Sequence, residues 1–160
     1  MTAFVVDTNV AIVANGGEMT HADLACQLCC IEKLESVVEE HTVAVDSMGL
    51  ILEEYQGYLS FSGQPGMGDM FFKHLFDFQY QDANVLRVPV THTDDEQRGF
   101  EELPRNTFDP SDRKFLAVAV VAEAVVLNAT DSDWDEEKPL MDRLGVEVEQ
   151  LCPQYARKRN

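Results

Sequence analysis

The chain opens on a short apolar run that ends in an acid, Phe4-Val5-Val6-Asp7-Thr8-Asn9-Val10. A valine-rich run of this length is typical of a central strand in a parallel sheet, because such a strand is buried on both faces. In an open parallel sheet, ligands bind beyond the carboxyl ends of the strands. Asp7 therefore stands where a functional side chain is expected.

Further apolar runs follow, and stretches with a helical pattern separate them. The predicted strands are Ala3–Val6, Thr42–Val45, Val85–Val90, Ala124–Leu127 and Val146–Leu151. The predicted helices are Ala22–Glu39, Met48–Ser60, Met67–Gln79, Asp94–Leu103, Pro110–Glu123 and Glu136–Leu144. This alternation predicts an α/β fold with a mainly parallel central sheet. We expect a single domain over residues 1–152, with an extended helical and loop segment at about 61–104, and a basic tail over 153–160 that contains Arg157-Lys158-Arg159.

The bulk composition fits a compact domain. A chain of 160 residues that is 45% hydrophobic can bury a core without staples. The longest apolar stretch, Phe115 to Ala122, is too short to cross a bilayer, and the N-terminus does not read as a signal peptide. We expect a soluble cytoplasmic protein.

The charge is strongly negative, with 12 basic against 29 acidic residues and a formal net charge of −17. Nucleic acid is a polyanion, and nonspecific affinity for it normally comes from Lys and Arg that displace its counterions. The charge therefore argues against tight, promiscuous binding of nucleic acid. Acids clustered around divalent cations would form part of the excess, and solvation in a salty cytosol or a basic partner protein would account for the rest.

The four cysteines are expected to be structural. Cys26 and Cys29 have the C-x₂-C spacing of a zinc knuckle, but no second pair completes a tetrahedral site. Together with Cys30 they lie in a helix-like setting, and free thiols in a reducing cytosol behave as small apolar residues. The same reading covers Cys152.

Residues 61–68, Phe-Ser-Gly-Gln-Pro-Gly-Met-Gly, are predicted to form a loop from their glycine and proline content. The segment lacks the Gly-Lys-Ser/Thr ending of a phosphate-binding loop, so it is interpreted as a hinge or connector. The helix that follows has an aromatic face, which indicates either core packing or a dimer contact.

Several carboxylates fall at predicted strand ends. Asp46 closes the second strand, and Asp131 and Asp133 follow the fourth by a short turn. A single aspartate at such a position is often only a turn or helix-entry residue. Several aspartates that converge on one sheet edge would instead indicate a functional site.

Two further acids lie on predicted helices. Glu54 stands at the flank of an apolar stripe, whereas Glu53 points closer to solvent. Asp109 is typical of an N-cap, which places Asp112 in the first turn of a helix, facing the dipole. Stabilisation of the helix start is a sufficient reason for an acid at Asp112. The small residues that follow also allow the helix to pack closely on the sheet, so the same acid can reach the sheet edge.

The chemistry gives a reason to group these acids. Phosphodiester hydrolysis needs an activated water and relief of charge on the leaving oxygen, and hard divalent ions bound by carboxylates can supply both. Carboxylates about an ion's width apart repel each other unless a cation lies between them or their pKa values rise. No nucleophilic side chain is then required, and the four histidines show no metal-ligand spacing.

Four blocks resemble the motifs of PIN domains, in order, over nearly the whole chain from Phe4 to Leu151. They read Phe4-Val5-Val6-Asp7-Thr8-Asn9-Val10, Leu50-Ile51-Leu52-Glu53-Glu54-Tyr55, Asp112-Arg113-Lys114-Phe115-Leu116-Ala117-Val118-Ala119 and Asn128-Ala129-Thr130-Asp131-Ser132-Asp133-Trp134. The chain departs from the family pattern at Ala129, where a Thr or Ser is usual, and in the long segment from Phe61 to Pro104.

The resemblance implies a three-layer α/β/α sandwich and an endoribonuclease that uses Mg²⁺ or Mn²⁺. It assigns Asp7, Glu54, Asp112 and Asp131 as catalytic metal ligands, with Asp133 as a secondary ligand. Thr8 would position a ligand or substrate phosphate, with Asn9 in support. An RNA substrate, an antitoxin and a homodimer are partners that the family leads us to expect.

Three other functional classes compete with this interpretation. An inactive PIN-like interaction module suits the −17 charge and the scarcity of Lys. A receiver-type regulatory domain would use Asp46 as phosphoacceptor, but the lysine expected at the end of a late strand is missing. A haloacid-dehalogenase-like phosphatase would need an aspartate where Asn9 stands.

Overall fold

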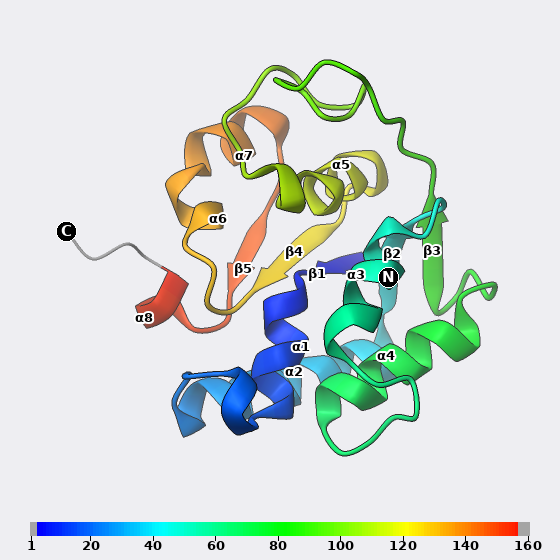
Figure 1. The fold of residues 1–160 in the computed structure, drawn as a ribbon, viewed down its shortest axis with the longest axis vertical. Coiled ribbons are helices and arrows are strands. Elements are labelled where there is room, and N and C mark those ends of the chain that lie inside the picture. The colour runs from blue at the N-terminus through cyan, green and yellow to red at the C-terminus, as the bar shows by residue number, and fades with distance from the viewer. Residues whose placement is uncertain (1–2, 157–160) are drawn as a thin grey trace.

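Five strands form one all-parallel sheet in the computed structural model, which describes residues 3–156 (Figure 1). The strands are β1 (Ala3–Val6), β2 (Thr42–Asp46), β3 (Val85–Val88), β4 (Val125–Asn128) and β5 (Val148–Gln150). All five predicted strands and the parallel sheet are confirmed, with small shifts at the strand ends. The basic cluster at 157–159 lies outside the described residues.

The strand order, β3-β2-β1-β4-β5, reverses between β1 and β4. The chain runs outward from β1 to β2 and β3, and then crosses to β4 on the other side of β1. Phe4 pairs with Val125 and Val6 with Leu127, so β1 and β4 end side by side at the same sheet edge. Ligands of open parallel sheets bind at such a switch point.

Helices cover both faces of the sheet, as right-handed crossovers require when the strand order reverses. They are α1 (Thr8–Asn15), α2 (Leu24–Glu40), α3 (Leu50–Tyr58), α4 (Met67–Phe78), α5 (Arg113–Ala122), α6 (Asp133–Glu136), α7 (Lys138–Leu144) and α8 (Pro153–Ala156), with single 3₁₀ turns at η1 (Gly17–Met19) and η2 (Pro110–Asp112). Figure 1 shows α1, α2 and α4 on one side of the sheet and α5 and α7 on the other. Within residues 3–156, no helix is long and apolar enough to span a membrane.

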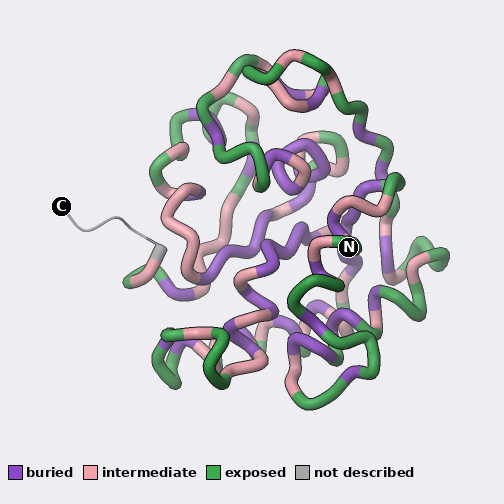
Figure 2. Tube along the Cα trace, viewed as in Figure 1, coloured by how far each residue is buried: buried purple, intermediate pink, exposed green. Residues whose placement is uncertain are grey.

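The core lies between these helices and the sheet (Figure 2). Val5 and Val6 of β1, Val126 of β4 and Leu116 of α5 are fully buried. Apolar side chains on both sides of β1 and β4 therefore hold the two strand ends rigidly, which matters for the acids that follow them.

Helix α1 was not predicted from the sequence. Asp7 begins it as N-cap, because its side chain accepts a hydrogen bond from the Asn9 amide. Gly16 ends it at a positive φ of 67°. Asp7 and Gly16 mark the two ends of a helix of only 8 residues. A stretch of this length is too short for its apolar residues to show a clear helical period.

The helix predicted over Asp94–Leu103 is wrong, since this segment forms turns and one bridge between His92 and Phe100. The buried Arg113 at the start of α5 organises it: its guanidinium donates to the Glu96 carbonyl at 2.8 Å and to both oxygens of Asn106. Of these acceptors, the Glu96 carbonyl lies within the predicted helix and is turned toward Arg113. The loop therefore packs on the N-terminus of α5.

The predicted glycine-rich loop is a connector between α3 and α4. A Cβ on Gly68 would lie 2.1 Å from the Ala11 carbonyl oxygen, and one on Gly66 would lie 2.8 Å from the Cα of Asn15. The glycines therefore allow the start of α4 to approach α1. On α4, Phe71 and Phe72 are buried whereas Phe76 is exposed, so core packing explains only part of the aromatic face.

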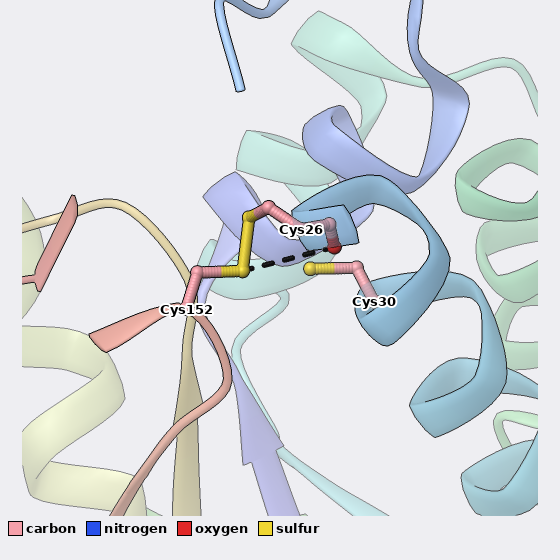
Figure 3. Close-up of side chains that lie close together, drawn as sticks. All are labelled: Cys26, Cys30 and Cys152. Atoms are coloured by element: carbon pink, nitrogen blue, oxygen red, sulfur yellow. Dashed lines mark hydrogen bonds between the residues drawn. A yellow bond between two sulfur atoms is a disulfide. The ribbon is translucent and has the colours of Figure 1, made fainter. Parts of the chain in front are cut away.

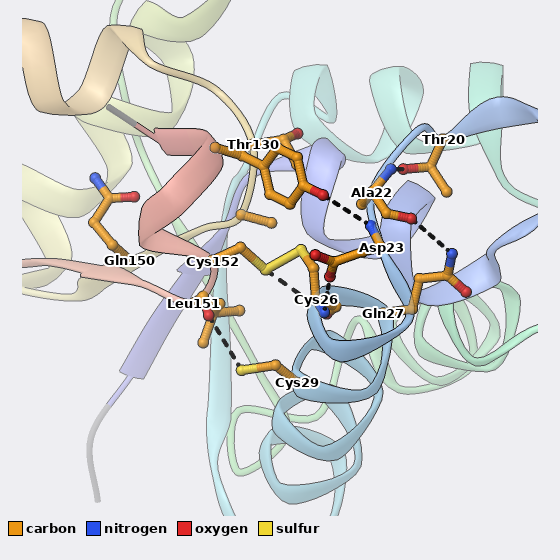
Figure 4. The surroundings of a disulfide bond; sticks show 12 residues. Thr20, Ala22, Asp23, Cys26, Gln27, Cys29, Thr130, Gln150, Leu151 and Cys152 are labelled. Carbon is orange, nitrogen blue, oxygen red and sulfur yellow. Dashed lines mark hydrogen bonds between the residues drawn. A yellow bond between two sulfur atoms is a disulfide. The ribbon is translucent and has the colours of Figure 1, made fainter. Parts of the chain in front are cut away.

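The expectation that all four cysteines are free thiols is wrong for two of them. Cys26 on α2 and Cys152 after β5 form a disulfide, and the buried Cys30 thiol lies beside it (Figure 3). The Tyr155 hydroxyl accepts a hydrogen bond from the Asp23 amide, and the Cys29 thiol donates to the Leu151 carbonyl (Figure 4). The pairing was missed because its partners are 126 residues apart. It fastens the segment after β5 to the first turn of α2.

Reduction of this disulfide should lower the free energy of unfolding by about 2–5 kcal/mol, because the cross-link closes a very long loop in the unfolded chain. Urea unfolding with and without dithiothreitol measures the difference. The control is the double variant Cys26→Ser/Cys152→Ser, which should not respond to the reductant. An equal response of the wild type and the double variant would show that the bond is not formed.

Candidate metal centre

Three aspartates from distant parts of the sequence meet at the edge where β1 and β4 end. One carboxylate oxygen of each of Asp7, Asp112 and Asp131 lies within 4.8 Å of the others. Asp7 follows β1, Asp131 lies in the turn after β4, and Asp112 lies immediately before α5. The convergence that the sequence pattern predicted is therefore present for these three residues.

Asp7 is buried and held from two sides. Its Oδ1 accepts the Asn9 amide at 3.2 Å, and its Oδ2 accepts the indole N–H of the buried Trp134 at 2.7 Å. Burial raises the pKa of Asp7 to about 6 against these hydrogen bonds, and the charges of Asp131 and Glu54 add to the rise. The carboxylate is thus fixed in direction but poorly compensated in charge.

Asp131 is placed by a hydrogen-bonded turn that two asparagines organise. The amide group of the fully buried Asn128 donates to the Asp131 carbonyl, and its oxygen accepts the Asp131 amide. Asn9 donates to the Asn128 side-chain oxygen at 2.9 Å and accepts the amides of Ala129 and Thr130. The start of α1 and the turn after β4 therefore form one unit, in which Ala129 contributes only its backbone.

Asp112 ends the 3₁₀ turn that Asp109 caps through the Ser111 amide. The predicted cap at Asp109 is confirmed. The carboxyl group of Asp112 meets that of Asp131 at hydrogen-bonding distance, and its pKa is raised, first by burial and then by the charges of Asp7 and Asp131. Two ionised acids cannot share such a contact without a proton or a cation.

The donor set fits a hard divalent cation. Such ions take carboxylate oxygens as ligands, and a positive charge here would remove the repulsion that raises these pKa values. Hydrogen bonds orient both carboxylates, as is common for metal ligands. Asn9 and Trp134 donate to the two oxygens of Asp7, and the Asp133 amide donates to one oxygen of Asp131.

Glu54 lies beside this group but is not one of its three members. Its Oε2 accepts the Thr8 hydroxyl, and its Oε1 accepts the Lys114 ammonium at 2.8 Å. The helix-face prediction holds, since Glu54 is half-buried and Glu53 exposed. The Tyr55 hydroxyl, which donates to the Val6 carbonyl at 2.5 Å, ties this helix to the end of β1.

Asp133 belongs to a neighbouring group. One oxygen of each of Asp109, Asp112 and Asp133 lies within 4.8 Å of the others, so Asp112 is shared between the two groups. Asp133 thus lies next to the group of Asp7, Asp112 and Asp131 and is not one of its members.

Asp46 has a structural role that explains its position. Its two oxygens accept the Leu50 and Ile51 amides, each at 2.8 Å, and the side chain is 1% exposed. It caps α3 and presents no oxygen to solvent for phosphorylation. This observation argues against the receiver-type alternative.

Three contributors were not singled out from the sequence: Trp134, Asn128 and Lys114. The aromatic residue after Asp133 was part of the motif, but nothing in the sequence indicated its hydrogen bond to Asp7. Asn128 is a polar residue that ends a buried strand, and that is a usable signal because a buried amide needs partners. Lys114 carried no signal of its own.

The chain was compared with protein-family models, with curated proteins and with solved structures, and no match was found in any of the three comparisons.

Asp112→Asn should stabilise the metal-free protein, because it removes an acid that the folded state can hold only at a cost, whether charged or protonated. We expect a gain of about 1 kcal/mol in the presence of EDTA, or roughly 2–4 °C in melting temperature for a chain of this size. Asp109→Asn on the same turn is the matched comparison. Ser111 lowers the pKa of Asp109, so this variant loses a stabilised carboxylate and should gain less than Asp112→Asn, although it also removes one of the charges that raise the pKa of Asp112. A lower melting temperature for Asp112→Asn would contradict the electrostatic reading.

Proposed function

We propose that this chain is a PIN-like, divalent-metal-dependent nuclease with a three-layer α/β/α architecture, and that RNA is its substrate. The observation that carries the proposal is the meeting of Asp7, Asp112 and Asp131 at the β1–β4 switch point. Acidic groups also cluster without a metal, but here Asp7 is buried, Asp112 and Asp131 are in contact, and hydrogen bonds orient Asp7 and Asp131.

The three aspartates would hold Mg²⁺ or Mn²⁺, with Asp133 in a secondary position. When bound, the ion would polarise the scissile phosphate and lower the pKa of an attacking water. Trp134 and Asn9 hold the Asp7 carboxylate in one orientation, and Asn128 holds the turn that carries Asp131. The chain itself therefore supplies ligand positions that do not have to reorganise.

The choice of RNA over DNA, an antitoxin partner and a homodimer are supported only by the resemblance of the four sequence blocks to PIN domains. The exposed aromatic residues of α4, such as Phe76, are compatible with a protein contact. These three remain predictions.

Mn²⁺ should stabilise the wild type, by about 2.7 kcal/mol at a concentration one hundred times the dissociation constant. Asp7→Asn and Asp131→Asn should lose most of this stabilisation and should lose cleavage of RNA, because each removes a charged ligand while Asn can still cap or close its turn. Thermal unfolding with Mn²⁺ and gel assays over several RNAs measure the two effects. Asp142→Asn, on an exposed residue paired with Lys138, is the control.

The outcomes separate the proposal from its main alternative. Wild-type activity in purified Asp7→Asn or Asp131→Asn would refute the nuclease assignment. Mn²⁺ binding without cleavage of any RNA would favour the inactive interaction module, which the −17 charge also suits.

A further inference from the structure

An ion pair joins Lys114 to Glu54, one of the predicted site acids. Lys114 is in the first turn of α5, two residues after Asp112, and its ammonium also donates to the Ser111 carbonyl at 2.5 Å. The neighbouring Arg113 points into the loop at Glu96 and Asn106. Lys114 is therefore the cation that this stretch of chain places beside the acids.

We propose that Lys114 binds a phosphate oxygen of the substrate, and that Glu54 positions Lys114 instead of binding the metal; this inference rests on the proposed function. An ammonium has three N–H donors, and two are taken by Glu54 and Ser111. No third hydrogen-bond acceptor is found among residues 3–156, where the ammonium otherwise lies over the ring of Phe115, 5.2 Å from its centroid. Lys114 keeps 15% of its side-chain surface exposed, so a ligand can reach it.

The position of Glu54 supports the second half of the inference. Both of its oxygens already have partners, Thr8 on one and Lys114 on the other. An ammonium in direct contact with a carboxylate reduces the attraction of that carboxylate for a second cation. Asp7 also accepts hydrogen bonds on both oxygens, but its donors are neutral N–H groups, whereas Glu54 contacts an ammonium. Glu54 is therefore less suited to ligate an ion, and the Thr8 hydroxyl fixes it as a support for Lys114.

The charge of the site explains why such a lysine matters. If all four ionise, Asp7, Glu54, Asp112 and Asp131 carry four negative charges against the single positive charge of Lys114, a formal sum of −3. A phosphodiester approaching this surface is repelled, and the protein as a whole repels it further at −17. A lysine acts as a point charge toward phosphate, and its place next to the metal ligands would align the substrate.

The first test measures RNA binding apart from cleavage. Binding of a fluorescent single-stranded RNA is followed by anisotropy with Ca²⁺ in place of Mn²⁺, at several salt concentrations. Lys114→Met should weaken binding about tenfold and reduce the salt slope by about 0.7, the value for one lost phosphate contact on a single strand. Lys114→Arg should retain most of the affinity. Lys73→Met, which removes an exposed lysine paired with Asp77, is the matched control and should match the wild type.

The second test measures metal affinity through thermal unfolding with Mn²⁺. Glu54→Gln should bind Mn²⁺ nearly as well as the wild type but bind RNA as weakly as Lys114→Met, since the lysine loses its support. Asp112→Asn should lose Mn²⁺ affinity by at least about tenfold. A loss of Mn²⁺ affinity in Glu54→Gln equal to that in Asp112→Asn would overturn the positioning role.

The two proposals fail in different ways. If the wild type neither binds Mn²⁺ nor cuts RNA, the nuclease function falls and this inference falls with it. If the wild type does both while Lys114→Met keeps the wild-type RNA affinity and salt slope, only the role of Lys114 is overturned. Melting temperatures without metal confirm that each variant is folded, and Lys114→Gln replaces Lys114→Met if the latter is not.

Discussion

Mutual repulsion among Asp7, Asp112 and Asp131 is the constraint around which the sheet edge is built. Three carboxylates within 4.8 Å of one another destabilise any state that brings them together, and burial of Asp7 and Asp112 increases the cost. The folded chain must offset this cost elsewhere. It does so through the packing of β1, β4 and α5, whose apolar side chains are among the most deeply buried in the described chain.

Each aspartate is held by a different device, and the devices are connected. Asp7 is fixed by a strand and a helix cap, Asp131 by the paired amides of Asn9 and Asn128, and Asp112 by a short turn that leads into α5. Asn9 takes part in the first two. Its backbone amide donates to the Asp7 side chain, and its side chain accepts the Ala129 amide in the turn before Asp131. A shift of α1 would therefore move two acids together and preserve their separation, which is what a shared ligand would require of them.

The sequence allowed prediction of the sheet and of where three of the grouped acids lie, because strand ends and helix starts follow local rules. Asp7 and Asp131 follow buried runs, and Asp112 follows a recognisable cap at Asp109, so each position was set by nearby residues. The failures involve distant partners. The loop over residues 94–103 depends on the buried Arg113, and the disulfide depends on Cys152 reaching Cys26 around the whole chain. The environment of Glu54 likewise depends on Lys114, which is 60 residues away. Periodicity and capping rules contain no information about such pairs.

The acid excess of the chain has a consequence for the order of events at the proposed site. Counted as fully ionised, the four acids and Lys114 sum to −3, so the metal-free centre repels phosphate and one lysine cannot reverse that field. A bound divalent ion would reduce this formal sum from −3 to −1 and leave Lys114 as a local positive contact. Metal binding would then precede RNA binding and act as a condition for it, in addition to any part in the chemical step. In a basic nuclease the protein surface would hold RNA before the ion arrived, whereas here the −17 charge removes that route. Affinity for RNA would therefore depend on the metal concentration, and the same charge that argues against promiscuous binding would confine binding to the place where the ion and Lys114 meet.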